Sequence, residues 1–123
     1  MNRAGAARLI LAADALGCGA AAAAVGLAPA VLRPVDPSLR ARGPLALTLA
    51  ATSLVMAFGS RASQPSRRQM TTATSVNAVW VAGCLVALPR QRNRVSAALV
   101  ASTALLDAAA GGLQWFLRPE RES

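Results

Sequence analysis

The chain has 123 residues, of which 54% are hydrophobic, and thirteen basic against five acidic residues give it a formal net charge of +8. All thirteen basic residues are arginine, and the sequence contains no histidine. The lack of histidine excludes a histidine general base, a histidine-containing catalytic triad, and a haem or zinc site with a histidine ligand. Two cysteines are too few for a four-cysteine zinc site. We therefore expect a single domain without a metal or cofactor.

The positive charge is typical of nucleic-acid-binding proteins, but the placement of the arginines argues against that function. They fall into short clusters separated by stretches that are nearly free of charge. These clusters lie at residues 3–8, 33–42, 61–68, 90–94 and 118–121. No segment interleaves arginine with apolar residues at helical spacing, and aromatic side chains for base stacking make up only 3% of the chain. We therefore expect no nucleic-acid partner.

Four apolar stretches between these clusters predict transmembrane helices. They are residues 9–32, 44–60, 70–89 and 95–117. Each is near the roughly 17–25 residues that a helix needs to cross a hydrocarbon core about 30 Å thick. Only Asp14 and Asp107 carry charge inside them, whereas an alanine-rich soluble bundle, the alternative, needs a polar face on every helix. The sequence predicts an all-α, transmembrane four-helix up-down bundle formed by residues 1–123 as one membrane domain.

The connections between the predicted spans are polar and rich in arginine, as loops at the level of the lipid headgroups should be. Four spans place both termini on one side, termed here the terminal side, with seven arginines against six on the other. This small difference gives the positive-inside rule almost no bias, so the orientation stays open. We expect a multi-pass protein of the cell inner (plasma) membrane with cytoplasmic termini. Asp14 within the first apolar run argues against cleavage of that run as a signal peptide.

Four polar side chains from three predicted spans lie in the half of the bilayer nearer the terminal side. These residues, termed the polar cluster, are Asp14, Asn77, Asp107 and Gln114. At 1.5 Å per residue their depths below the terminal side are about 8–9, 10, 15 and 4–5 Å, respectively. A carboxylate facing lipid without a partner is costly, so we expect these side chains to face one another. Arg8 and Arg118 are also near enough to reach Asp14.

The polar cluster admits two functions. Its members can join helices through hydrogen bonds worth about 0.6–2 kcal/mol each, in a non-enzymatic membrane protein. Alternatively, Asp14 and Asp107 can exchange a proton in a small proton-coupled transporter or transporter subunit. No nucleophile and base can be paired from this sequence, which argues against an enzyme. The expected partners are the lipid bilayer and either a second copy of the chain or another membrane protein.

Small residues at helical spacing predict close packing of the first and fourth spans. These residues are Gly17, Ala21, Ala104, Ala108 and Gly112. Trp80 lies in the middle of the third span, where it is expected to be a packing residue. Trp115 and Arg118 lie at the end of the fourth span, which predicts an interfacial anchor.

Three short features make the chain similar to a known class of proteins. With Asp14, Val76-Asn77-Ala78-Val79-Trp80 and Leu113-Gln114-Trp115, it resembles small four-span bacterial integral membrane proteins of unassigned role. This resemblance covers the whole length and implies no activity. In size and layout the chain is also similar to small multidrug-resistance transporters, which carry a single acid in the first of about four helices. Their acid is a glutamate and their aromatic-rich pocket has no counterpart here, and Asp107 is a further departure.

Overall fold

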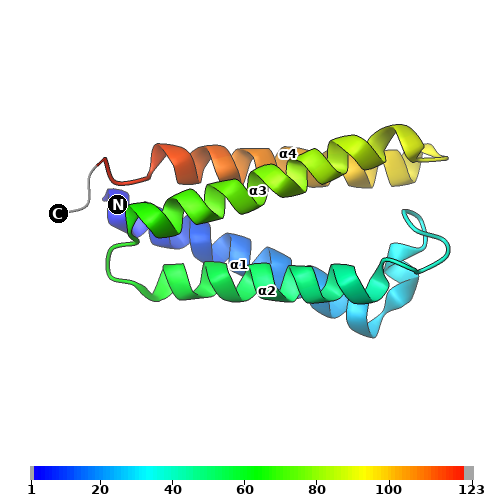
Figure 1. Ribbon diagram of the computed structural model, residues 1–123, viewed down its shortest axis with the longest axis horizontal. Coiled ribbons are helices and arrows are strands. Elements are labelled where there is room, and N and C mark those ends of the chain that lie inside the picture. The colour runs from blue at the N-terminus through cyan, green and yellow to red at the C-terminus, as the bar shows by residue number, and fades with distance from the viewer. Residues whose placement is uncertain (1, 121–123) are drawn as a thin grey trace.

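The computed structural model describes residues 2–120 and is built from helices, with no strand in that range. The helices are α1 (Arg3–Leu27), α2 (Arg42–Arg61), α3 (Arg67–Ala87) and α4 (Arg94–Phe116), with short 3₁₀ turns η1 (Pro29–Leu32) and η2 (Leu88–Arg90). Successive helices run in opposite directions, so the N- and C-terminal ends of the chain lie at the same end of the molecule (Figure 1). This end is termed the terminal end. The predicted all-α four-helix bundle is confirmed.

The first helix differs most from its predicted boundaries. The predicted span covered residues 9–32, whereas α1 begins at Arg3 and ends at Leu27. The Asn2 side chain accepts a 2.8 Å hydrogen bond from the backbone N–H of Gly5, and this cap starts the helix ahead of the apolar run. Pro29 cannot donate a backbone hydrogen bond, and the chain continues from it as the 3₁₀ turn η1. The fourth helix begins and ends within one residue of the predicted range 95–117.

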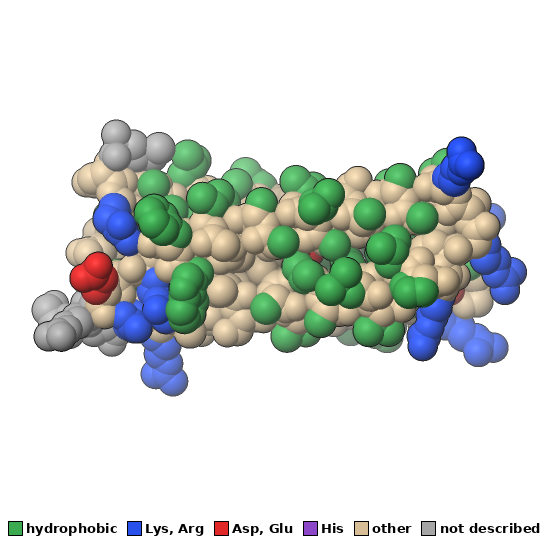
Figure 2. Space-filling view, turned by 90° about the horizontal axis from the view of Figure 1, so that it is seen from above, with side chains coloured by type: hydrophobic (Ala, Val, Ile, Leu, Met, Phe, Trp, Pro, Cys, Tyr) green, Lys and Arg blue, Asp and Glu red, His purple; other side chains and the backbone are tan. Residues whose placement is uncertain are grey.

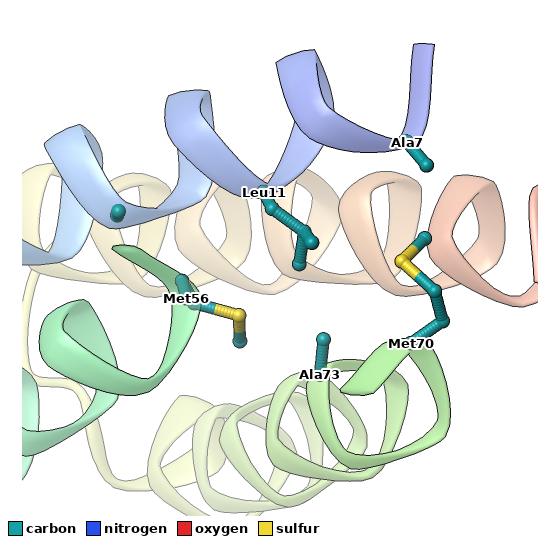
Figure 3. Packing of buried hydrophobic residues seen from close by; sticks show 6 residues of the cluster. Ala7, Leu11, Met56, Met70 and Ala73 are labelled. Carbon is teal, nitrogen blue, oxygen red and sulfur yellow. The ribbon is translucent and has the colours of Figure 1, made fainter. Parts of the chain in front are cut away.

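The four helices form two hairpins, in which α1 packs along α2 and α3 packs along α4. Contacts between the hairpins are sparser and involve α1 with α4 and α2 with α3. A small apolar core joins the hairpins, with Leu11 of α1 lying near Met56 of α2 and near Met70 and Ala73 of α3 (Figure 3). Leu11 is the ninth of the 25 residues of α1 and Met70 is the fourth of the 21 residues of α3, so the apolar core joins the hairpins in the half of the bundle nearer the terminal end.

Many large apolar side chains are exposed on the outside of the bundle. Figure 2 shows arginine side chains at both ends of the molecule and hydrophobic side chains spread over the band between them. Leu16 is 75% exposed, and Leu47 and Phe58 are each 74% exposed. By length and composition, all four helices are suited to cross a membrane. The surface therefore has the distribution of charge and hydrophobicity that a bilayer favours.

Candidate functional site

A triad of polar side chains lies inside the bundle and connects three helices. The Asp14 Oδ2 atom of α1 accepts hydrogen bonds from Asn77 Nδ2 of α3 at 2.7 Å and from Gln114 Nε2 of α4 at 2.8 Å. Asn77 Nδ2 also donates to Gln114 Oε1 at 2.8 Å, which closes the ring of contacts. Asn77 is 1% exposed and Gln114 is fully buried. These three residues, termed the polar triad, link the two hairpins.

The approach of α4 to α3 next to the polar triad depends on Gly111. A Cβ atom at this position would lie 3.1 Å from the Cβ of Asn77, closer than side chains ordinarily pack. One turn earlier on α3, the Thr74 hydroxyl donates to its own helix at Met70 and also lies 3.4 Å from the Gly111 carbonyl oxygen. Gly111 precedes Gln114 by one turn, so the small residue sets the helix spacing at which the Gln114 amide reaches Asn77.

The partners of the Asp14 side chain are the two amides and, on its Oδ1 atom, the Cys18 thiol, which donates at 3.9 Å. Arg8 and Arg118 were near enough by sequence to reach it, but both engage other partners. The Arg8 side chain donates to the Ser60 carbonyl oxygen at 3.3 Å, and the Arg118 guanidinium lies 3.5 Å from the centre of the Trp115 ring. Two neutral N–H groups on one carboxylate oxygen supply hydrogen bonds to a carboxylate without neutralising its charge.

Asp107 lies outside the polar triad, although the sequence placed it in the same cluster. It occupies the same face of α4 as Gln114 but lies seven residues earlier, about 10.5 Å along the helix axis. Among residues 2–120, none of the hydrogen bonds of the polar triad includes Asp107. Its carboxyl group is half-buried on the same side of α4. The structure thus brings together three of the four predicted residues and leaves the fourth deeper in the bundle.

The small residues predicted to pack closely lie mostly away from the contacts within this chain. Gly17 and Gly112 are exposed, and a Cβ atom built on either would meet nothing within 4 Å. Ala108 is also exposed, while Ala21 and Ala104 are half-buried. Gly17 and Gly112 therefore do not set the helix spacing inside the chain, and a packing role for them between chains stays a prediction.

The close approach of α1 to α2 falls two residues away from Gly17, at Gly19. A Cβ atom at Gly19 would lie 3.0 Å from the Ser53 hydroxyl oxygen. That hydroxyl donates a 2.7 Å hydrogen bond across the interface to the Ala15 carbonyl oxygen. Ala7, Leu11 and Ala15 are buried at intervals of four residues, and Gly19 continues this series. The series was visible in the sequence as a stripe of small and apolar residues on the other side of the helix from Gly17.

The two tryptophans lie at different levels of the bundle. Trp80 is half-buried, and its indole nitrogen lies 3.5 Å from the Thr52 hydroxyl oxygen, a long contact between α3 and α2. Trp115 is 52% exposed at the terminal end of α4, where Arg118 stacks over it. The two residues predicted as an interfacial anchor are therefore in direct contact.

Several arginines hold the ends of neighbouring helices, a role that the sequence did not reveal. Arg3, the first residue of α1, donates to the Phe116 carbonyl oxygen at the end of α4 at 2.6 Å. Arg42, the first residue of α2, donates to the Gly26 carbonyl oxygen near the end of α1, also at 2.6 Å. The last carbonyl groups of a helix have no hydrogen-bond partner within it and carry partial negative charge. An arginine from a neighbouring helix supplies both the hydrogen-bond donor and the positive charge.

No protein-family model matches the chain, and neither curated proteins nor solved structures provide a match. The similarity to small multidrug-resistance transporters is thus one of size and layout only. Within the described range of residues 2–120, no group of three or more acidic, cysteine or histidine side chains could hold a metal ion. The polar triad is the strongest candidate site in this part of the chain.

Proposed function

We propose that the protein is a non-enzymatic integral membrane protein in which the polar triad fixes the association of two helical hairpins. The observation that carries the proposal is that polar side chains are buried and large apolar ones exposed, the reverse of the arrangement in a water-soluble protein. Asn77 and Gln114 are buried, while large apolar side chains such as Leu16 and Leu47 are exposed. In water this arrangement keeps apolar surface in contact with solvent and removes polar groups from it, and both are costly. In lipid the same arrangement is favourable, because the outer apolar surface meets hydrocarbon.

The polar triad matters more in lipid than an equivalent contact would in water. Apolar side chains between the hairpins gain little in lipid, because the lipid tails that they displace are equally apolar. Hairpin association must then depend on close packing and on hydrogen bonds between helices. The Asp14 carboxylate supplies two such bonds, one to each helix of the second hairpin. At about 0.6–2 kcal/mol per bond, the triad contributes a substantial part of the association free energy.

The proposed location is the cell inner membrane, with both termini in the cytoplasm. The arginines at both ends of the bundle would lie at the two headgroup layers, where Trp115 and Arg118 anchor the terminal end. Reporter fusions at residue 36 and at the C-terminus test the orientation, since the two reporters should lie on opposite sides. Activity of a periplasm-dependent reporter at the C-terminus would overturn the cytoplasmic assignment.

A proton-coupled transporter is the second candidate, and Asp107 is the residue that favours it. This carboxyl group lies half-buried at the deepest level of the polar cluster and outside the polar triad, so no hydrogen bond of the triad occupies it. A proton on one of two interacting carboxyl groups changes the proton affinity of the other. Under this function, Asp107→Asn should abolish proton-linked uptake or efflux driven by a pH gradient in proteoliposomes. Under the first proposal the variant should leave the bundle intact and no such efflux should exist in the parent.

The membrane proposal is tested by the partitioning of the protein in a cell lysate. We expect the chain in the membrane fraction after an alkaline carbonate wash and in solution only after addition of a detergent. Recovery of a monodisperse particle from a lysate without detergent would contradict membrane insertion. That result would also remove the depths on which the transporter candidate depends.

A further inference from the structure

An open groove of about 370 Å³ lies between α2 and α3 in the half of the bundle nearer the terminal end. Leu11 and Met56 of the apolar core line its floor together with Gly59. Val55 and Phe58 of α2 line its walls, with 46% and 74% of their surface exposed. We term this feature the α2–α3 groove. It is a mainly apolar surface groove on the outer face of the bundle, which would be in contact with lipid.

The floor of the α2–α3 groove depends on the absence of a side chain at Gly59. A Cβ atom there would lie 3.0 Å from Leu11 Cδ1 and 3.9 Å from the Cβ of Gln69. Gly59 therefore lets Leu11 reach between α2 and α3 while the space above it stays open. The sparse contacts between these two helices leave that space unfilled by the chain itself. In a membrane, this open space would be occupied by lipid.

The polarity of the α2–α3 groove changes along its length in the manner of a phospholipid. Arg68, the second residue of α3, lines the groove at the headgroup level, and Thr72 lies four residues or about 6 Å deeper. On the opposite wall, Val55 lies six residues before Arg61, the last residue of α2, or about 9 Å below it. The groove is thus basic at its mouth, bears a hydroxyl below, and is apolar at the depth where acyl chains begin.

The charge of the terminal end favours an anionic occupant. Its described arginines outnumber its described acidic residues, which consist of Glu120 alone. These arginines are Arg3, Arg8, Arg61, Arg67, Arg68 and Arg118. Some of them also hold helix ends, but their positive charge remains. An added anion is attracted to this end, whereas the ammonium group of a zwitterionic headgroup meets like charge.

We propose that the α2–α3 groove binds one anionic phospholipid, with its phosphate at Arg68 and the upper part of one acyl chain against Val55 and Phe58. This inference rests on the proposed membrane location, which supplies the lipid and sets the depth of the groove. The phosphate gains a charge-assisted contact, and the acyl chain fills space that the side chains leave open. The bound lipid would bridge α2 and α3, the helices through which the hairpins contact each other on this side.

Native mass spectrometry of the full chain, delipidated and held in a non-ionic detergent, tests the site. The probes are dioleoyl phosphatidylglycerol and dioleoyl phosphatidylcholine, added at equal concentration. The parent should retain one phosphatidylglycerol at least threefold more tightly than phosphatidylcholine. Arg68→Gln should weaken phosphatidylglycerol binding about fivefold, as expected for one cation near a headgroup. Thr72→Trp should fill the groove and abolish binding, while Arg92→Gln, which removes the same charge at the opposite end, should change nothing.

The lipid site is overturned by equal retention of both lipids, by unchanged retention in Arg68→Gln, or by an equal loss in Arg92→Gln. Retention that survives a folded Thr72→Trp variant also overturns it. Arg68 and Thr72 are exposed, and circular dichroism verifies that each variant keeps its helices. If Thr72→Trp loses its helical signal, the comparison of Arg68→Gln with Arg92→Gln alone decides whether phosphatidylglycerol binds at the groove. If the parent protein needs detergent but retains no phosphatidylglycerol, only the proposed lipid site is contradicted. If the parent is soluble without detergent, the proposed membrane location is contradicted as well.

Discussion

The guanidinium group of Arg42 donates a 2.6 Å hydrogen bond to the carbonyl oxygen of Gly26, so the first residue of α2 holds the last turn of α1. A second bond from Arg42 reaches the Val25 carbonyl oxygen at 3.4 Å. A cation at the start of a helix is unfavourable for that helix, because it meets the positive end of the helix dipole. The antiparallel neighbour reverses this effect by presenting its negative end at the same level. Arginine clusters at the loops therefore serve the fold as well as the headgroup layer.

Replacing Arg42 should destabilise the hairpin formed by α1 and α2. Arg42→Gln is expected to lower the free energy of unfolding by about 1 kcal/mol, because charge-assisted bonds made by an exposed side chain are lost. Arg42→Lys should recover part of the loss, since an ammonium group lacks the planar fork that spans two carbonyl groups. Arg40→Gln, in the same loop, is the control and should have little effect. Thermal unfolding in detergent ranks the midpoints of the parent and the three variants. Equal midpoints for Arg42→Gln and Arg40→Gln would contradict the role of Arg42 in the hairpin.

Asp14 should tolerate asparagine but not leucine. Both amide donors of the polar triad bond to one oxygen of Asp14, and an asparagine side chain retains one such oxygen. Asp14→Asn is therefore expected to leave the unfolding midpoint nearly unchanged. Asp14→Leu removes the acceptor and leaves buried donors without a partner, at a cost of about 1–3 kcal/mol. Detergent-solubilised variants can be compared by tryptophan fluorescence during heating.

Two results would change this interpretation of Asp14. If leucine were as stable as the parent, the polar triad would have no part in hairpin association. If asparagine kept stability but eliminated efflux driven by a pH gradient, the transporter candidate would gain over the structural proposal. Asp107→Asn provides the matched test on a carboxyl group outside the polar triad.

The sequence allowed the number and direction of the helices to be predicted because arginine clusters interrupt the apolar stretches. It also placed Asp14, Asn77 and Gln114 together, since depth along a helix follows directly from residue count. The same reasoning included Asp107, which shares a face with Gln114 but lies two turns away from it. Residue count thus selected the right half of the bundle, while contact between particular side chains depended on distances of a few ångströms.

The rotation of each helix about its axis was harder to predict than its depth. Ala20–Ala24 and the other alanines of α1 offer small residues on every side, so the sequence gives several equivalent stripes. Gly17 and Gly19 differ by about 200° around the helix, and only the partner helix selects between them. The hydrogen bond from Arg42 to the Gly26 carbonyl oxygen could not be predicted for the same reason, because it depends on how α1 and α2 pack against each other.

Adjacent glycines on α4 should respond in opposite ways to added bulk. Gly111→Leu is expected to force α3 and α4 apart, because even its Cβ would lie 3.1 Å from the Cβ of Asn77. Such overpacking typically costs about 1–3 kcal/mol, and here it also separates Gln114 from Asn77. Gly112→Leu should be neutral or stabilising, since its Cβ meets nothing within 4 Å and leucine favours helix. Unfolding midpoints test the pair, and a loss confined to Gly112→Leu would instead indicate that this face packs against another chain.

Asp36 should clamp the loop between η1 and α2 in its charged form only. Its carboxylate accepts hydrogen bonds from the Ala41 backbone N–H at 2.9 Å and from the Ser38 hydroxyl at 2.7 Å. The clamp closes around Leu39, whose φ of 57° lies in the left-handed region that non-glycine residues rarely adopt. The Ala41 bond, followed by the Ser38 bond, lowers the pKa of Asp36 below its usual range.

Because the folded pKa of Asp36 is the lower one, its contribution to stability is present above the unfolded pKa of about 3.9 and is lost as pH falls through the folded value. We expect the Asp36 carboxyl carbon and the Ala41 amide to titrate together in NMR spectra, with one midpoint below that of an unfolded aspartate. In Asp36→Asn the Ala41 amide should lose this transition, because Asp36 is the only acidic residue between η1 and α2. An Ala41 amide that stays constant in the parent while Asp36 titrates in its ordinary range would mean that the carboxylate does not hold the loop. The clamp should therefore weaken in acid and remain intact at neutral pH, where the carboxylate is fully charged.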